Sequence, residues 1–428
     1  MAVSAAPSEI NSATTDNGQL LAADGVPLST KLARATRRSR IQAFLLVLPL
    51  LAFVTIFFVT PIVKMALLSF SDDVFVTEMP RTTKALASWN GQGIPDEPVF
   101  KALVEDLIEG RKNRTTAKVG GQLNFIYSGA RSLVVSTGRR AKRFEAPFKE
   151  AVINKDKRWE DPVLWQLIRT VSTPTTSIYY LNAVDRTVDA SGNVVQVEEN
   201  IRIHLQIFWR TLWLSALVTF LCFLLGYPVA YLLAHLPTKT SNLLLICVLL
   251  PFWTSLLVRI TAWIALLQND GVILSSLVSL GLIADQGRPQ LVYNMFGTIV
   301  AMVHVLMPLM ILPIFSVMKT ISPSYMRAAR SLGATKVTAF RRVYFPQTLP
   351  GIAAGSMLVF ILSVGYYITP ALLGGQSGVL ISNFIALHME STLNWGLAAA
   401  LGTLLLMATL ILYWLFNTLI GIDKLKVG

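Results

Sequence analysis

The sequence contains few charged residues and few cysteines. Of its 428 residues, 14% are charged and 53% are hydrophobic, whereas about a quarter of the residues in soluble domains are charged. The two cysteines, Cys222 and Cys247, lie inside apolar runs and indicate neither a disulfide nor a metal site, and we expect no cofactor. The net charge of +13 comes from basic residues beside apolar runs rather than on one solvated face, which argues against nucleic acid as a partner. This composition is typical of a membrane protein.

Motifs for ATP hydrolysis and for catalysis are also missing. No GxxxxGK[ST] motif is present, so the chain does not hold ATP phosphates in a Walker loop. Residues 372–376 resemble a signature of ABC ATPases, but without a Walker loop they are interpreted as a turn. We predict no enzymatic activity and no catalytic residue, because the four histidines show neither a metal-binding spacing nor a nucleophile–base arrangement.

Six apolar runs are long enough to cross a bilayer, for which roughly 20 apolar residues suffice. The first, 41–70, has no small-residue cleavage site, so we expect an uncleaved helix rather than a signal peptide. The polar and then basic residues 1–40 before it are predicted to form a disordered tail. We predict an all-α membrane protein with six transmembrane helices and a membrane core over 208–428. The other five predicted spans are 208–236, 241–267, 291–318, 351–370 and 397–420.

Basic residues beside these runs predict the orientation, because Lys and Arg favour the cytoplasmic flanks of short loops. With the N-terminus inside, the inner flanks hold fourteen Lys and Arg, whereas the short outer loops hold one, Arg288. We therefore expect both termini, and residues 319–351, to lie in the cytoplasm.

A charged segment, residues 71–207, separates the first two spans. We expect it outside the cytoplasm, since long segments are translocated largely regardless of charge. Asp96 or Glu97 is predicted to begin one helix and Asp161-Pro162 another, and the stretch SIYYLNAVDRTVDASGNVVQV is predicted to form a hairpin turning at 191–193. These patterns favour a small α+β or mixed domain. An extended loop packed over the outer face is the alternative.

The predicted spans contain no Asp or Glu. Proton- and ion-coupled carriers usually have intramembrane carboxylates, because a group within the membrane must bind the coupling ion. Their absence argues against a secondary transporter.

Residues 319–351, here called the basic loop, contain six basic residues and no acidic one. Ser322 and Thr335 are predicted to cap two short helices, with Gly333 supplying the left-handed turn between them. Two such helices suit docking into a groove on another protein. An interfacial loop that merely obeys the positive-inside rule is the alternative.

The second of these helices, 336–345, is predicted to carry an apolar stripe of Val337, Phe340 and Tyr344. Pro346 is expected to end it, and Pro350-Gly351 to redirect the chain into the fifth span.

The basic loop resembles the EAA loop of ABC-importer permeases, in which Glu-Ala-Ala is followed by Gly-Ala, Phe and two prolines. This resemblance implies that the loop is the coupling helix that sits in a cleft of a separate ATP-binding subunit. This chain has Arg327 at the position of the family's Glu. A charge on the partner that pairs with the Glu therefore cannot pair with this residue in the same way. The matching positions are Arg327, Ala328, Ala329, Gly333, Ala334, Phe340, Val343, Pro346, Pro350 and Gly351.

Two further stretches resemble spermidine/putrescine-type permeases: LPFWTSLLVRITAWIALLQNDGVIL and VGYYITPALLGG. The resemblance covers roughly 208–426, and the insert is longer than in ordinary members. It implies the type I ABC-importer permease fold in a bacterial inner membrane. It further implies a second homologous permease, an ATP-binding subunit and a periplasmic solute-binding protein as partners, and a polyamine as solute.

Polar and aromatic residues in or near the spans are candidates for the translocation path. Arg259 either lines the path or pairs across a subunit interface, unless it lies near the outer end and extends to the lipid headgroups. Aromatic faces attract polyamines by cation–π interaction, although packing in the core or against lipid is the commoner role of such residues. The candidates are Trp253, Thr254, Arg259, Tyr366, Tyr367 and Glu390.

The sequence leaves two alternative functions open. One is a channel or facilitator that needs no ATPase, and the other is a membrane-anchored receptor that acts through residues 71–207.

Overall fold

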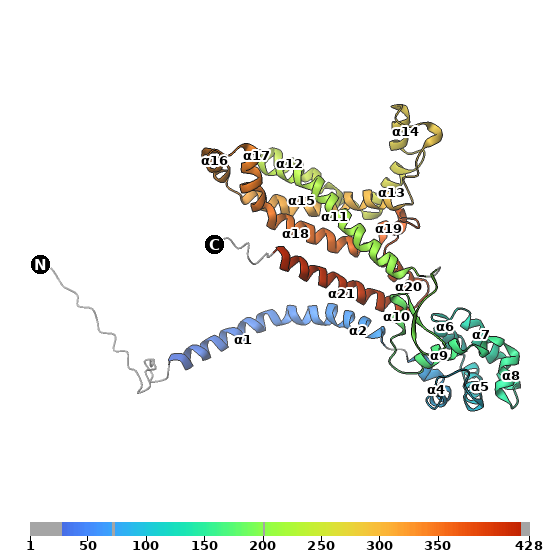
Figure 1. The fold of residues 1–428 in the computed structure, drawn as a ribbon. Coiled ribbons are helices and arrows are strands. Elements are labelled where there is room, and N and C mark those ends of the chain that lie inside the picture. The colour runs from blue at the N-terminus through green and yellow to red at the C-terminus, as the bar shows by residue number, and fades with distance from the viewer. Residues whose placement is uncertain (1–27, 71–72, 200–201, 421–428) are drawn as a thin grey trace. The chain divides into compact units, whose positions relative to one another are not determined.

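A computed structural model describes residues 28–70, 73–199 and 202–420. Within these ranges the chain is almost wholly helical, with one pair of short strands (Figure 1). The prediction of an all-α membrane protein with six membrane helices is confirmed, because six helical segments have the required length and hydropathy. These are Ser39–Leu68, His204–His235, Leu256–Ser279, Met295–Thr320, Lys336–Val364 and Trp395–Thr418.

The first apolar segment comprises α1 (Leu28–Val54), a π-helical turn (Thr55–Val59) and α2 (Thr60–Leu68). Described residues up to Met65 form one compact unit, and the rest of the chain forms another. The prediction of disorder is wrong for residues 28–40, which are helical in α1, because the Leu, Ala, Lys and Arg of KLARATRRSR are good helix formers. Residues 1–27 of the predicted tail lie outside the described residues.

The segment between the first two spans, described over 73–199 and here called the insert, has its own buried core. Asp161 caps α9 (Pro162–Val171), accepting a hydrogen bond of 2.9 Å from the Val163 N–H. Asp96 precedes α5 (Glu97–Lys112). Both predicted helices are therefore confirmed, and the insert is a folded domain rather than an extended loop. Its largest fully buried side chains are Phe75, Phe100, Trp159 and Trp165.

The predicted hairpin of the insert is confirmed in its second half. Strands β1 (Arg186–Val188) and β2 (Val194–Gln196) pair antiparallel. The residues before them form a helix, α10 (Ile178–Ala183), rather than a strand, because this segment packs into the insert core and against α21. The remaining insert elements are α3 (Val74–Glu78), α4 (Pro80–Leu86), α6 (Thr116–Asn124), α7 (Ala130–Arg140), α8 (Phe148–Lys155) and the 3₁₀ turns Ala141–Arg143 and Lys157–Glu160.

Three long helices form the centre of the membrane core: α11 (His204–His235), α15 (Met295–Thr320) and α18 (Phe345–Val364) (Figure 1). Small residues let them approach closely. A Cβ added at Gly351 would lie 2.9 Å from the carbonyl oxygen of Pro313 on α15. The backbone of α18 therefore lies directly on α15.

The third predicted span, 241–267, is wrong as a single helix. The structure divides it into α12 (Thr238–Leu249), a 3₁₀ turn (Leu250–Trp253) and α13 (Leu256–Leu267), followed by α14 (Val272–Ser279). Pro251 has no N–H to continue the ladder, and Thr254 and Ser255 are extended, so the helix breaks there.

One carboxylate lies within the third apolar segment as the structure bounds it, although in a loop, as the sequence predicts. The third apolar segment extends to Ser279 and includes Asp270, in the break between α13 and α14. Its side chain is 97% exposed and lies 3.6 Å from Arg288.

The last part of the core contains α19 (Ile368–Leu373), α20 (Ile381–Glu390) and α21 (Trp395–Ile420). The buried core of the insert continues into α20 and α21, and includes Ile381, Leu397 and Leu401. At Gly396 an added Cβ would lie 2.5 Å from the ring of Tyr179, so α10 of the insert rests directly on the backbone of α21. The insert and the end of the membrane core thus share one hydrophobic cluster.

Candidate functional site

The basic loop folds locally as its sequence predicts. Helix α16 (Pro323–Ser331) begins at Ser322, whose hydroxyl accepts the Ser324 N–H at 3.3 Å. Helix α17 (Lys336–Ala339) begins at Thr335, whose hydroxyl accepts the Thr338 N–H at 3.2 Å. Gly333 lies between them with φ of +88°, a conformation that residues with a side chain resist. Both caps and the turn are confirmed.

Apolar and basic side chains share the exposed surface of this loop. Leu332 is 89% exposed, Val337 75% and Tyr325 53%. Arg327, Arg330 and Lys336 are exposed beside them. Large apolar side chains exposed together on a capped, short structure are typical of a docking surface.

Val337 was predicted to lie in one apolar stripe with Phe340 and Tyr344, and this is wrong. Its side chain faces outward, and Ala339 is buried instead. The helix widens after Ala339 into a π-helical turn, Phe340–Tyr344, which changes the face that each residue presents.

Aromatic rings join the loop to α11. The ring centroid of Tyr231 lies 5.8 Å from that of Phe340 and 5.6 Å from that of Tyr344. Tyr227 lies 5.8 Å from Phe345, and His235 lies 5.5 Å from Tyr344. Tyr227, Tyr231 and His235 were not among the predicted site residues, although their spacing of four residues places them on one helical face. Together we call these residues the aromatic cluster: Tyr227, Tyr231, His235, Phe340, Tyr344 and Phe345.

The prolines of the loop do not act as predicted. Pro346 was expected to end the second helix and Pro350-Gly351 to redirect the chain, but α18 continues through both prolines to Val364. A π-helical turn precedes Pro346, and two side chains add hydrogen bonds to backbone carbonyls in the same segment. Gln347 Nε2 donates to the Val343 carbonyl (2.7 Å), and the Thr348 hydroxyl donates to that of Phe345 (2.7 Å).

The ten residues that match the EAA loop therefore fall into three groups. Arg327 and Ala328 are exposed on α16, and Ala329 and Ala334 are partly buried near the turn at Gly333. Phe340 and Val343 lie in the π-helical turn. Pro346, Pro350 and Gly351 lie in α18, where Gly351 makes the contact with α15.

Arg259 is the most unusual residue among the path candidates. It lies on α13, and its Nε and Nη1 atoms are buried without a hydrogen-bond partner among the described residues. It lies within electrostatic range of His304 on α15 and of Tyr366 after α18. The His304 ring accepts a hydrogen bond from the Trp263 indole (3.0 Å) and lines a cavity of about 360 Å³ between α11, α12 and α15.

The other path candidates lie at breaks between helices. Trp253 is 79% exposed and, with the exposed Thr254, lies where α12 and α13 separate. The carbonyls of Tyr366 and Tyr367 accept hydrogen bonds of 2.7 Å each from the side chains of Ser382 and Asn383, which ties the end of α18 to the start of α20. Glu390 is exposed at the end of α20.

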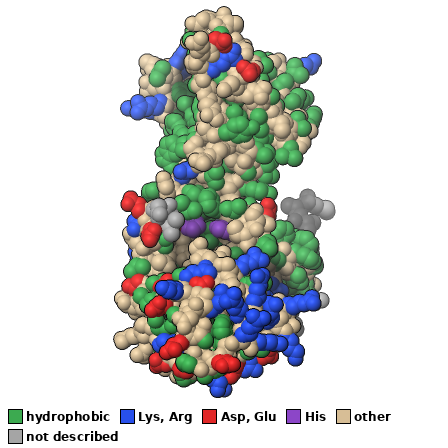
Figure 2. Space-filling model, turned by 90° about the vertical axis from the view of Figure 1, so that its right-hand side faces the viewer, with side chains coloured by type: hydrophobic (Ala, Val, Ile, Leu, Met, Phe, Trp, Pro, Cys, Tyr) green, Lys and Arg blue, Asp and Glu red, His purple; other side chains and the backbone are tan. Residues whose placement is uncertain are grey.

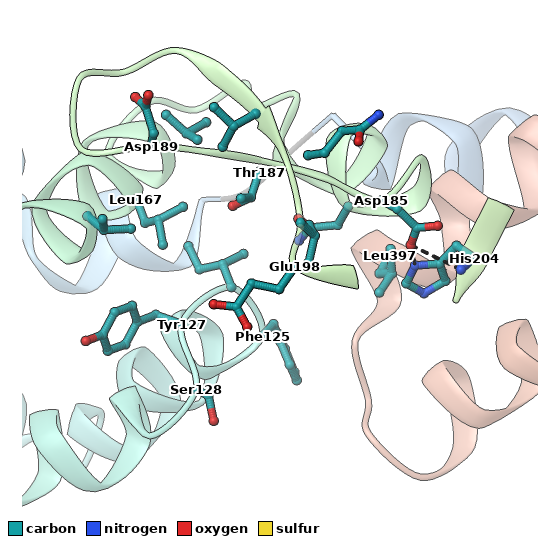
Figure 3. A pocket seen from close by; sticks show the side chains of 17 residues that line it. Phe125, Tyr127, Ser128, Leu167, Asp185, Thr187, Asp189, Glu198, His204 and Leu397 are labelled. Atoms are coloured by element: carbon teal, nitrogen blue, oxygen red, sulfur yellow. Dashed lines mark hydrogen bonds and ion pairs between the residues drawn. The ribbon is translucent and has the colours of Figure 1, made fainter. Parts of the chain in front are cut away.

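A larger cavity, of about 710 Å³, lies between the insert and the ends of α11 and α21 (Figure 3). Asp185, Asp189, Glu198 and His204 line it, no Lys or Arg does, and none of the six path candidates reaches it. Tyr127 on its wall donates a hydrogen bond of 2.8 Å to Asp161. Burial, and after it this hydrogen bond, raise the pKa of the Tyr127 phenol to about 12. This cavity is separate from the predicted path.

Comparisons with known proteins match the membrane core. The sequence profile of the family described as "Binding-protein-dependent transport system inner membrane component" matches residues 226–422. The spermidine/putrescine transport system permease protein PotB of Haemophilus influenzae is 35% identical over 222 residues, 51% of this chain and 77% of that protein. PotB of Escherichia coli (strain K12) is 32% identical over 222 residues, 51% of this chain and 80% of that protein.

A third relative, the inner membrane ABC transporter permease protein YdcU of Escherichia coli (strain K12), is 33% identical over 225 residues, 50% of this chain and 71% of that protein. The profile match begins within α11, so the insert lies outside it. The resemblance inferred from the basic loop is confirmed. The chain belongs to the family of binding-protein-dependent transport system inner membrane components, as a permease subunit of an ABC importer that crosses the inner membrane several times.

Proposed function

We propose that this permease imports a polyamine such as spermidine or putrescine, and that a separate ATP-binding subunit drives it by docking on the basic loop. The observation that carries the docking proposal is the exposed combination of Leu332, Val337 and Tyr325 with three basic side chains on a capped loop. A groove with apolar walls and acidic residues complements such a surface.

The aromatic cluster supplies a route for force from the loop into the membrane core. Movement of α16 and α17 with the ATP-binding subunit acts on Phe340 and Tyr344, which contact Tyr231 on α11. The close contact at Gly351 carries the same movement to α15. The three central helices then tilt together, and the path alternates between inward-open and outward-open states.

The solute is proposed from the names of the PotB relatives. Helices α11, α15, α18 and α21 contain no Asp or Glu, so this chain offers a polycation few charged partners. Selection then depends mainly on a periplasmic solute-binding protein and on a second, homologous permease. Trp253, Thr254, Tyr366 and Tyr367 line the path by cation–π and hydroxyl contacts, and Glu390 attracts the solute near its outer end.

Arg259 has a different role in this proposal. A buried cation beside the path would repel a polyamine, and its Nε and Nη1 atoms have no partner among the described residues. We therefore place it at the interface with the second permease, where an acidic side chain would pair with it.

Co-purification tests the docking proposal. The full chain is expressed with its own ATP-binding subunit, and the amount of that subunit recovered is measured. Leu332→Asp is expected to lower recovery at least tenfold, because it places a carboxylate in an apolar contact. Val194→Asp, at an exposed apolar residue of the insert, is the control and is expected to recover the subunit fully. Equal recovery of the ATP-binding subunit with both variants would show that the basic loop is not the docking surface.

Uptake in cells that lack other polyamine importers tests the solute. Cells with the complete importer are expected to accumulate labelled spermidine, and excess putrescine is expected to compete while sulfate does not. Accumulation of sulfate without spermidine would overturn the polyamine assignment and leave the docking proposal standing.

A further inference from the structure

Asp185 joins the insert to the first turn of α11. This carboxylate is 5% exposed and lies between α10 and β1. It accepts the backbone N–H of His204 at 3.1 Å and that of Leu205 at 2.8 Å. Nδ1 of His204 also lies 3.0 Å from it (Figure 3). A carboxylate can only accept, so this nitrogen carries the proton.

A second histidine lies beside this pair. His388 belongs to α20, and its ring centroid is 6.4 Å from that of His204. Its Nδ1 lies 3.0 Å from the hydroxyl of Thr392. Its Nε2 is buried and has no hydrogen-bond partner among the described residues. Figure 2 shows histidine side chains in the band between the insert and the apolar part of the molecule.

Charged groups on the elements around the two rings are few, and on α11 itself Arg210 donates to the Gln376 carbonyl at 3.1 Å. Helices α10, α19 and α21, which pack nearby, contain no Asp, Glu, Lys, Arg or His. On α20 itself, Glu390 is exposed. Asp189 and Glu198 of the hairpin line the same cavity as His204. Burial lowers the pKa of His388, and the neighbouring His204 lowers it further.

We propose that Asp185, His204 and His388 form a proton-operated latch, which holds α20 against the insert end of α11 while His388 is neutral. A proton on His388 places a cationic ring in a buried site beside His204, with no acceptor for Nε2 among the described residues to stabilise it. The closed latch therefore binds this proton less tightly than an open one, in which His388 has an ordinary pKa near 6.5.

The sign of the pH dependence follows from this difference. The closed state is fully favoured above about pH 6.5 and loses population as the pH falls, by up to tenfold per pH unit for one proton. Because α20 is tied to the end of α18 through Ser382 and Asn383, opening the latch loosens the insert end of the transport helices. Acidification outside the cell would thus change the state of the importer independently of its solute.

Histidine NMR on the full chain in lipid nanodiscs tests the first part. The chain has four histidines, so selective labelling gives few signals, and single His→Gln variants assign them. His388 is expected to titrate below pH 6.5, and its midpoint is expected to rise in His204→Gln. A His388 midpoint at or above 6.5 in the unaltered chain would overturn the proposal, whatever the variants do.

Hydrogen–deuterium exchange on the same samples tests opening. After correction for intrinsic exchange, peptides over 203–210 and 381–392 are expected to exchange at least tenfold faster at pH 5.5 than at pH 7.5. His388→Gln is expected to reduce this change to less than twofold, whereas His235→Gln, at the opposite end of α11, is expected to retain it. A pH response equal in His388→Gln and the unaltered chain would exclude the latch. No ATP-binding subunit or solute is present, so the result is independent of the proposed function.

Discussion

At the scale of single residues, Gly333 determines the shape of the basic loop. Its φ of +88° costs a residue with a side chain roughly 1–2 kcal/mol, and a β-branched residue more. An added Cβ there meets no atom within 4 Å, so any effect of substitution arises from the backbone alone.

We predict that Gly333→Val lowers transport-coupled ATP hydrolysis at least tenfold, because α16 and α17 lose their fixed angle. ATPase activity of the reconstituted importer with and without binding protein measures this. Gly281→Val is the matched control, since Gly281 also has positive φ and open space around it. Normal coupling in Gly333→Val would show that the left-handed turn is not needed.

The charge of residue 327 on α16 shows whether the docking groove of the ATP-binding subunit requires a basic or an acidic side chain at this position. We predict that Arg327→Glu, which restores the family residue, retains assembly and keeps or increases ATPase stimulation. Arg330→Glu, on the same short helix, is the comparison, and assembly is measured by co-purification. Complete loss of assembly in Arg327→Glu alone would mean that Arg327 has an acidic partner of its own in the ATP-binding subunit.

At the scale of elements, the aromatic cluster connects a surface loop to a membrane helix. Each aromatic pair contributes about 0.5–1.5 kcal/mol beyond its buried area, and Tyr231 takes part in contacts with both Phe340 and Tyr344. We predict that Tyr231→Ala still binds the ATP-binding subunit but reduces uptake several-fold, because the loop then moves without α11. Tyr231→Phe keeps the ring and is expected to transport normally, as measured by initial uptake rates. A loss of binding in Tyr231→Ala would instead assign the cluster to shaping the docking surface.

Elements that depend on local interactions could be predicted from the sequence, and those that depend on distant residues could not. Ser322, Gly333 and Thr335 act through bonds within a few residues, so the helix starts and the turn could be predicted from sequence. The π-helical turn at Phe340–Tyr344 could not be predicted, because no local residue pattern specifies it and the rings that Phe340 contacts, Tyr227 and Tyr231, are distant in the sequence. The break between α12 and α13 was missed because the run 241–267 was judged by its length and overall hydropathy, although Pro251 is a helix breaker. The unpartnered nitrogens of Arg259 are likewise visible only once α13 and α15 are packed.

At the scale of the whole molecule, the distribution of Lys and Arg predicts the orientation of the chain. We predict that the insert lies outside the cytoplasm and the basic loop inside it. In a Cys247→Ser background, Asn113→Cys in the insert is expected to react with a membrane-impermeant maleimide in intact spheroplasts. Ser331→Cys in the basic loop is expected to react only after permeabilisation. The reverse pattern would show the opposite topology, in which the basic loop lies outside the cytoplasm and cannot bind an ATP-binding subunit there.

The contact between Tyr179 and Gly396 bears on how the protein is made. Residues of the insert leave the ribosome early, yet part of the surface that completes their core belongs to α21, which is synthesised last. The insert therefore reaches its final packing only after the last helix has entered the bilayer. Until then it exposes apolar side chains to the proteases and chaperones of its compartment. A chain that stops before α21 would therefore leave the core of the insert incomplete.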